Sequence, residues 1–351
     1  MSPELIIDYI DVLILKALLQ EPRTSFVKIA KEIGMSTPSV FNRFNSMKKN
    51  GIINGSIMQI YPKSMGYNCV ALANINSDQK QKDKIIDFLH HERIAIYGPH
   101  LTGSSNILGF IVTKNTDELS QIVKEIESHP AIRSVNTEIW VHNINVDHPE
   151  NLIIDSNTNS RGLAKKNSRD KNDNNTFKNV EKKLKYNENW AKTRKNLKLD
   201  DIDLSLIKIL VNDARISFRK LSKKLNISPN NVIKRYKKLR KNILSFSSIT
   251  LNLKKMGYIG TGVLMIKTID GYNVKEISDT ILSIPNMIVV IRLFGNYDII
   301  AITPFKDLTN LDDVTQKIRN LEGVHEINLM VDKPYEKWPL NTISNQIINE
   351  F

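Results

Sequence analysis

Apolar residues recur at helical spacing near the start of the chain and again about 190 residues later. The first stripe consists of Ile10, Ile14, Ala17 and Leu18, and the second of Ile202, Leu206, Ile209 and Leu210. Spacing of i, i+4, i+7 and i+8 places these side chains on one helical face. In both regions the pattern predicts this helix and then two shorter ones, at about 25–33 and 37–49 and at about 217–225 and 229–241.

The segments that follow these helices alternate between strand and helix patterns. In the first region we predict strand 69–76, helix 80–91, strands 94–99 and 106–113, helix 117–128 and strand 132–141. In the second we predict strand 261–268, helix 273–284, strands 287–294 and 298–304, helix 307–321 and strand 324–331. The order β-α-β-β-α-β is typical of a ferredoxin-like sheet with helices on one face. The other face needs a cover, and a second such sheet is the simplest candidate.

The two regions are copies of one module. Residues 8–50 align without a gap on residues 200–242 at an offset of 192, and 15 of these 43 positions are identical. This period is too long for a solenoid repeat, so it indicates duplication of a whole unit. We refer to the two units as the first copy and the second copy.

Each copy has the pattern of a helix-turn-helix. Three turn residues, 34–36 and 226–228, separate the second and third helices, and Ser36 and Ser228 are suited to cap the third helix. Pro229 occupies the favoured first helical position. Two short helices joined by a tight turn after a first helix are the plan of a DNA-reading helix-turn-helix.

The predicted fold class is therefore α+β, with two copies of a three-helix domain plus a ferredoxin-like βαββαβ domain. We place the helix-turn-helix domains at 1–58 and 199–250, the ferredoxin-like domains at 66–146 and 257–334, a basic flexible linker at 147–198 and a C-terminal tail at 335–351. The linker is rich in Asn, Lys, Ser and Asp, a composition typical of unfolded segments. Residues 178–195 could form a basic helix, and the tail could dock as a short helix.

The positive charge is confined to two segments. The chain carries +13 overall; residues 161–198 hold 13 basic against four acidic residues, and residues 199–250 hold 12 against four. A local basic excess indicates a polyanionic partner, with a solubilising linker as the alternative for 161–198. The lone Cys69 excludes an internal disulfide and fits a cytoplasmic protein. No apolar run is long enough to span a membrane, and the acidic N-terminus does not resemble a secretory signal.

The third helices carry the residues that we expect to contact double-stranded DNA. Residues in the first turns would reach base edges, whereas later lysines would meet phosphates. The first copy supplies Thr37, Pro38, Ser39, Asn42, Arg43, Lys48 and Lys49, and the second supplies Pro229, Asn230, Asn231, Lys234, Arg235, Lys237, Lys238 and Lys241. Asn and Arg suit this role because each makes bidentate contacts to a base.

Several short motifs occur at matching places in the chain: Asp8/Asp11 and Asp200/Asp203 at the helix starts, Asn212-Asp213-Ala214-Arg215-Ile216-Ser217, Gly51 after the third helix, Gly66-Tyr67 and Gly257-Tyr258, Gly295-Asn296-Tyr297-Asp298, and Gly323-Val324. With these motifs each copy resembles a full-length Lrp/AsnC (leucine-responsive) transcriptional regulator. The resemblance covers about 280 of the 351 residues. It implies a non-enzymatic regulator that needs no cofactor or metal and self-associates through the ferredoxin-like (RAM-type) sheets.

The same resemblance implies a small, amino-acid-like effector near Gly295, Tyr297 and Asp298. The first copy has Gly103-Ser104-Ser105-Asn106 in place of this loop, without the aspartate. The two sheets could pair within one chain as a pseudo-dimer, or each with its equivalent in a second chain.

Two alternatives remain open. Fused siroheme decarboxylases share this architecture, and Trp338-Pro339-Leu340-Asn341 resembles one of their motifs, but after the last strand rather than within the domain. The histidines of the chain are scattered, at His90, His91, His100, His129, His142, His148 and His325. The second alternative is an architectural protein that binds DNA through phosphates without regard to sequence.

Overall fold

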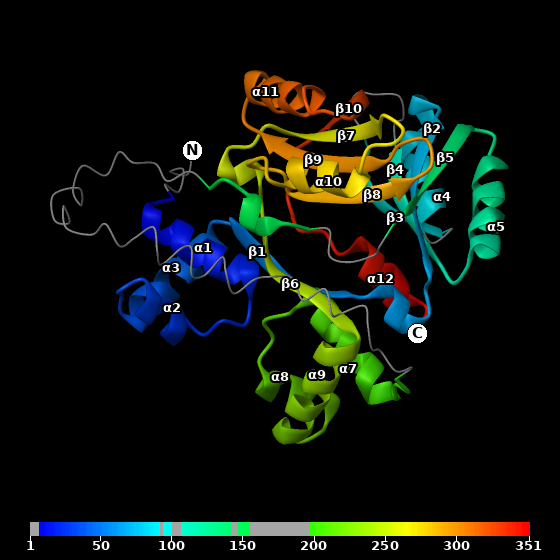
Figure 1. The fold of residues 1–351 in the computed structure, drawn as a ribbon. Coiled ribbons are helices and arrows are strands. Elements are labelled where there is room, and N and C mark those ends of the chain that lie inside the picture. The colour runs from blue at the N-terminus through cyan, green and yellow to red at the C-terminus, as the bar shows by residue number, and fades with distance from the viewer. Residues whose placement is uncertain (1–6, 92–93, 100–106, 142–146, 155–196) are drawn as a thin grey trace.

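The computed structural model describes residues 7–91, 94–99, 107–141, 147–154 and 197–351 of the chain. Two helix-turn-helix units lie on either side of a two-stranded ribbon, and a large sheet flanked by helices lies beyond it (Figure 1). The predicted basic helix at 178–195 and most of the predicted linker fall outside the described residues.

The helix-turn-helix units form as the apolar spacing predicts. The first contains α1 (Tyr9–Gln20), α2 (Phe26–Glu32) and α3 (Thr37–Lys49), and the second α7 (Asp201–Asn212), α8 (Phe218–Leu225) and α9 (Pro229–Asn242). The side chains of Ser36 and Ser228 accept hydrogen bonds from the amides of Ser39 and Asn231, which satisfies one free donor at each helix start. The predicted caps of both recognition helices are therefore present.

A strand follows each third helix, and the sequence analysis did not predict it. These strands, β1 (Ile53–Ile60) and β6 (Leu244–Leu251), pair antiparallel with each other and thus join the two copies. Each strand also packs on the first helix of the other copy, β1 on α7 and β6 on α1. Ser248 Oγ donates to the carbonyl of Leu19, and Ser56 Oγ donates to the carboxylate of Asp213, so these two equivalent serines both bond to the other copy, although to different acceptors.

The ferredoxin-like order is present in both copies. The first copy contains β2 (Cys69–Ser77), α4 (Lys82–His91), β3 (Ala95–Pro99), β4 (Ile107–Thr113), α5 (Thr116–Glu127) and β5 (Ile132–Trp140). The second contains β7 (Gly260–Thr268), α10 (Val274–Leu282), β8 (Val289–Phe294), β9 (Ile299–Phe305), α11 (Leu308–Arg319) and β10 (Val324–Asp332). The predicted boundaries agree to within about two residues.

The two four-stranded sheets join into one sheet of eight strands. Its order is β10-β7-β9-β8-β5-β2-β4-β3, and the junction pairs Ile139 with Phe294 and Trp140 with Leu293. The helix-covered faces form two separate apolar clusters, one in each copy. The faces without helices share a central cluster with both helix-turn-helix units, so each open face is covered by parts of the other copy.

Each copy also sends its final segment across to the other. Residues 147–154 bond to the end of α10 and the loop that leads from it to β8: the His148 amide donates to the carbonyl of Ile288, and Asn151 Nδ2 donates to the carbonyls of Leu282 and Met287. Leu152 is buried in the central cluster, so the first eight residues of the predicted flexible linker are packed instead. They order because they cover apolar surface of the second copy.

The C-terminal tail makes the reciprocal contact. Its helix α12 (Thr342–Asn349), expected as a short docked helix, packs against α7, β1, β3 and β4 (Figure 1). Trp338 is fully buried and bonds through its backbone to Leu251 in β6. The tail is thus an integral part of the central cluster.

Candidate nucleic-acid interface and inter-sheet cavity

The two recognition helices present different chemistry to solvent. On α9, Asn230, Asn231, Lys234, Lys237 and Lys241 are exposed, and its burial is confined to Val232 and Leu239. Helix α8 adds four more exposed cations that the sequence analysis did not assign, namely Arg219, Lys220, Lys223 and Lys224. The second helix-turn-helix unit therefore has a strongly basic outer surface.

Helix α3 has a much less basic outer surface. Pro38, Asn42, Lys48 and Lys49 are exposed, and Thr37 and Ser39 are half-buried in the first turn. At the equivalent positions Asn42 corresponds to Lys234, and the first-turn residues also differ between the copies. The solvent-facing positions of the recognition helices have diverged.

Arg43 and Arg235 do not face outward as the sequence analysis expected. Arg43 Nη1 lies 2.7 Å from Asp8 Oδ2 and 3.0 Å from Asp11 Oδ1, at the start of α1. Arg235 Nη1 lies 2.8 Å from Asp200 Oδ1 and 2.7 Å from the buried Asp203 Oδ1. Each guanidinium is held by carboxylates because an unpaired buried charge would be costly. These contacts explain why both aspartates and the arginine are the same in both copies.

The second ion cluster also includes a lysine. Lys238 Nζ lies 3.0 Å from Asp203 Oδ2, so this residue, too, is turned toward its own domain. Donation by the Asp203 amide and the Arg235 guanidinium lowers the pKa of Asp200, and the two carboxylates raise the pKa of Arg235. These ion pairs fasten the third helix to the first helix.

A pair of arginines crosses between the two helix-turn-helix units. Arg23 lies 4.5 Å from the ring centre of Phe218 and 5.0 Å from that of Tyr236, and its Nη2 donates to the Ile216 carbonyl at 2.7 Å. Its equivalent Arg215 lies 5.0 Å from the rings of both Phe26 and Phe44 and donates to the Pro22 carbonyl.

Burial lowers the pKa of both crossing arginines. Stacking of a guanidinium on an aromatic ring is favourable, and more so when water is excluded. Arg23 and Arg215 occupy equivalent positions of the repeat, and the sequence analysis gave neither of them a role. The same residue in both copies was a signal that this position matters. It could not reveal the contacts, because the partners of each arginine lie in the opposite copy.

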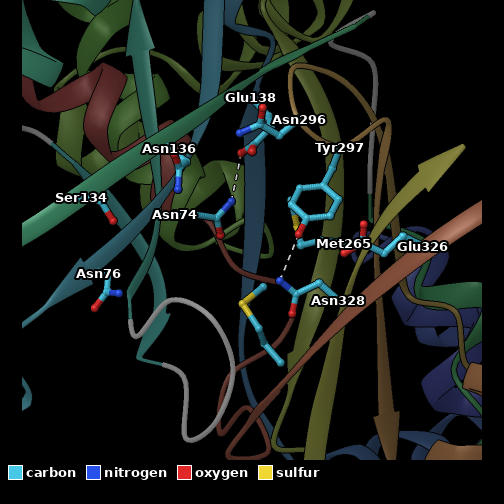
Figure 2. A pocket seen from close by; sticks show the side chains of 11 residues that line it. Asn74, Asn76, Ser134, Asn136, Glu138, Met265, Asn296, Tyr297, Glu326 and Asn328 are labelled. Carbon is cyan, nitrogen blue, oxygen red and sulfur yellow. Dashed lines mark hydrogen bonds between the residues drawn. The ribbon is translucent and has the colours of Figure 1, made fainter.

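The loop that the resemblance marks for effector binding lies at the junction of the sheets. Gly295 packs on Glu138 so closely that a Cβ there would lie 3.0 Å from the Glu138 Cγ. Tyr297 lines a cavity of about 320 Å³ between the two copies, and Asn328 donates to its hydroxyl at 3.1 Å (Figure 2).

Asp298 has partners within its own domain. Its Oδ2 accepts from the amide of Thr268 at 2.8 Å and from the hydroxyl at 2.9 Å, and Lys267 Nζ lies 3.6 Å from Oδ1. The carboxylate thus ties the start of β9 to the end of β7. Of the three loop residues, Tyr297 lines the cavity, and Gly295 packs on Glu138, which is another of its lining residues.

The described histidines do not gather at this cavity. His129 contacts Phe88 and accepts from the Ala131 amide, and His325 is exposed. The side chains of His90 and His91, and residues His100 and His142, lie outside what the structure describes. Among the described residues, no group of His, Cys, Asp and Glu has the arrangement of a metal site. Nor does any helix there have the length and apolar character of a membrane span.

Fold and surface together define a DNA-binding regulator with two helix-turn-helix units and a paired ferredoxin-like core. Residues 7–54 match the family model of winged helix-turn-helix DNA-binding domains, and residues 199–240 match that of the AsnC-type helix-turn-helix domain. The matches fall on the two units that the repeat identifies.

Relatives of known class extend the match beyond these units. An uncharacterised helix-turn-helix transcriptional regulator of Pyrococcus abyssi is 31% identical over 134 residues, which are 38% of this chain and 90% of the relative. The regulatory protein AsnC of Haemophilus influenzae is 29% identical over 139 residues, 39% of this chain and 93% of the relative. The chain belongs to the Lrp/AsnC family of transcriptional regulators, and each alignment spans about one copy.

One solved structure resembles the chain over nearly its whole length. The siroheme decarboxylase NirDL superposes with a TM-score of 0.58 at 11% identity, over 96% of this chain and 97% of that one. At this identity the likeness concerns the fold. It shows that the fused arrangement of two such units occurs in another protein.

Proposed function

We propose that the chain is a sequence-specific transcriptional regulator in which the two copies act together as an intramolecular pseudo-dimer. The observation that carries this proposal is the pair of unlike recognition helices, joined by the β1–β6 ribbon and the crossing arginines. A helix-turn-helix dimer reads two half-sites about one helical turn, roughly 34 Å, or a multiple of it apart. Because α3 and α9 differ at their exposed positions, the operator is asymmetric.

Two sets of residues contact DNA in this proposal. Base edges meet Thr37, Pro38, Ser39 and Asn42 on α3 and Pro229, Asn230, Asn231 and Lys234 on α9; phosphates meet Lys48, Lys49, Lys237 and Lys241. Three cations of these helices are not assigned to DNA, because their ion pairs hold them against their own domains. They are Arg43, Arg235 and Lys238.

Selection of bound sequences from a random DNA pool tests the proposal directly. We expect one enriched site with two unlike half-sites, bound by a monomer in dilute solution. Enrichment of perfect palindromes would contradict the unlike half-sites. A complex in which two chains each supply one copy to the bound site would contradict pairing within one chain. Equal affinity for selected and random DNA at fixed salt would instead identify an architectural protein.

An amino-acid-like effector acting near Gly295, Tyr297 and Asp298 is part of the same proposal. The support is the position of Gly295 and Tyr297 beside the inter-sheet cavity, where a ligand would touch both copies. A ligand that binds one arrangement of the copies better than another shifts the population between them. The repeat of the DNA selection in the presence of each amino acid tests this part.

The enzymatic alternative has less support in the described residues. The name of the structural neighbour indicates a siroheme substrate, a macrocycle with several carboxylates. Among the residues that the structure describes, those lining the inter-sheet cavity include two carboxyl groups and no Arg, Lys or His. This lining favours the regulator over an enzyme acting on such a substrate.

A further inference from the structure

The inter-sheet cavity is polar at one end of its floor and apolar at the other. Its mouth is formed by exposed residues such as Ser134, Asn136 and Glu326. Its buried floor consists of Asn74, Glu138, Met265 and Met330 (Figure 2). A volume of about 320 Å³ lies at the small end of the range for small-molecule sites, roughly 300–1,000 Å³.

Glu138 is the least satisfied polar group of this floor. Its side chain is 0% exposed, and Oε2 accepts from Asn74 Nδ2 at 2.9 Å. Oε1 is buried and has no hydrogen-bond partner in the part of the chain that the structure describes. A buried carboxyl oxygen without a donor is unfavourable, so a ligand that donates to Oε1 would be stabilised.

The charges of the residues that line the cavity indicate which charge a ligand should carry. In the described part of the chain, the lining residues include the carboxyl groups of Glu138 and Glu326 and no cationic side chain. An ammonium group would neutralise Glu138 and gain a charge-assisted hydrogen bond. A free amino acid would bring its own carboxylate into the same cavity, where the lining offers no cation to meet it.

The second copy supplies the apolar end. Met330 occupies the position equivalent to Glu138, and Met265 lies beside Asn328 on the paired strand. Methionine side chains are apolar and adaptable, so they accommodate hydrocarbon groups of varied shape. The Tyr297 ring, held by Asn328 (Figure 2), adds an aromatic surface to this end.

We propose that this cavity binds a small amphipathic amine that lacks a carboxylate. Its ammonium group donates to Glu138 Oε1 from within the cavity, and its hydrocarbon part lies against Met265 and Met330. The proposal rests on the effector part of the proposed function, because Tyr297 lines the same cavity, and it narrows that effector from an amino-acid-like molecule to an amine without a carboxylate. The site uses none of the residues assigned to DNA.

Protonation of Glu138 gives the site a characteristic pH dependence. Burial raises the pKa of Glu138 to about 7, although donation by Asn74 opposes the shift. An alkylammonium remains charged well above this pH, with a pKa near that of lysine, about 10.4. The affinity therefore rises as pH increases from 6 to 8, and binding at pH 6.5 releases a proton.

Calorimetric titration of the full chain with isopentylamine and with leucine tests the proposal. These probes share one hydrocarbon group and differ by the carboxylate. We expect binding of the amine at pH 8 and at least about tenfold weaker binding of leucine. Glu138→Gln keeps the size of the side chain and the bond from Asn74, and it should weaken amine binding by about 10- to 100-fold. Glu326→Gln at the exposed mouth is the matched control, with an expected change below about threefold.

Three results would overturn the proposal. These are equal affinities for leucine and the amine, unchanged amine affinity in a folded Glu138→Gln variant, and no binding heat at millimolar amine. Circular dichroism and thermal unfolding verify that the variant is folded. The DNA selection uses the chain without added amine, so a failure there contradicts the proposed regulator and leaves the titration interpretable.

Discussion

The two copies share a fold but differ in the parts that face a ligand. Residues that are the same in both make structural contacts, such as the aspartates at the helix starts with Arg43 or Arg235, and the crossing Arg23 and Arg215. The outer faces of α3 and α9 differ, and so do the two ends of the inter-sheet cavity.

Fusion makes this asymmetry possible. In a homodimer of two identical chains, a two-fold axis would place the same residue at both ends of the cavity. Two buried carboxyl groups at the positions of Glu138 and Met330 would repel each other when ionised. One chain that carries both copies can hold one carboxyl group and one methionine, and two unlike recognition helices.

The reciprocal crossing segments provide the largest expected effect. Trp338→Ala should reduce the free energy of unfolding by about 4 kcal/mol, since it empties a fully buried aromatic site. Leu152→Ala in the other segment should reduce it by about 3 kcal/mol. Urea denaturation measures both values. Equal small losses, below about 1 kcal/mol, would show that the segments do not hold the copies together.

The change Glu138→Gln tests whether the buried carboxyl group at one end of the cavity makes the stability of the chain depend on pH. The pKa of Glu138 is raised to about 7 in the folded chain, whereas the unfolded value is about 4.3. Below pH 4.3 the group is neutral in both states, so the variant and the parent chain have similar stability. As pH rises toward 7 the parent loses stability, because its unfolded state releases the proton more readily.

At pH 8 the glutamine variant should therefore be more stable by about 4 kcal/mol, since each pKa unit corresponds to about 1.4 kcal/mol. Denaturant titrations between pH 4 and pH 8 measure this difference. Glu326→Gln serves as the exposed control and should show no such trend. A constant difference at all pH values would contradict the raised pKa.

Charge removal compares the two recognition helices. The triple change of Lys234, Lys237 and Lys241 to alanine should weaken DNA binding by roughly 100-fold at 100 mM salt and reduce the salt slope by about two, because Lys237 and Lys241 are assigned to phosphates and Lys234 to a base. Changing Lys48 and Lys49 together should reduce the slope by about two. Electrophoretic mobility shifts at several salt concentrations give both slopes. Equal slopes for all variants would indicate that these helices do not face phosphates.

The crossing arginines give the smallest effect on stability. Arg23→Met or Arg215→Met should each cost about 1–2 kcal/mol, through the lost ring contacts and the lost bond to a carbonyl. Because these contacts connect the two units, we expect a greater loss of affinity for the complete operator than for either half-site. The exposed Arg219→Met is the matched control for the removal of one positive charge. An equal loss of affinity for the complete operator, for each half-site and for unrelated DNA would indicate an effect of charge alone.

Much of the fold followed from local pattern. Helical spacing, serine caps and turn residues lie within a few positions of each other, so α1 to α3 and α7 to α9 were predictable, as was the βαββαβ order. Strands β1 and β6 were missed because each pairs with a segment almost 200 residues away. Residues 147–154 were assigned to the linker for a related reason, since their composition is polar but Leu152 and Ile154 find apolar partners in the second copy.

The candidate sites divide in the same way. The basic character of α9 was readable from its sequence, but the direction of each cation was not. Arg235 and Lys238 turn to Asp203, which lies two helices earlier in the chain and comes next to them only in the folded domain, while Lys234 and Lys237 remain exposed. The burial of Glu138 was not predicted, because its strand has a polar sequence that is typical of an exposed strand. Gly295, which packs on Glu138, belongs to the other copy.

The sequence by itself determined that the chain contains two regulator-like units, their secondary structure and the family to which they belong. These properties depend on interactions between near neighbours and on the identity of short motifs. Only the tertiary structure decided that strands, arginines and terminal segments cross between the copies and that a carboxyl group is enclosed between their sheets. Those features depend on contacts between residues far apart in the chain, whose burial and pairing no local pattern specifies.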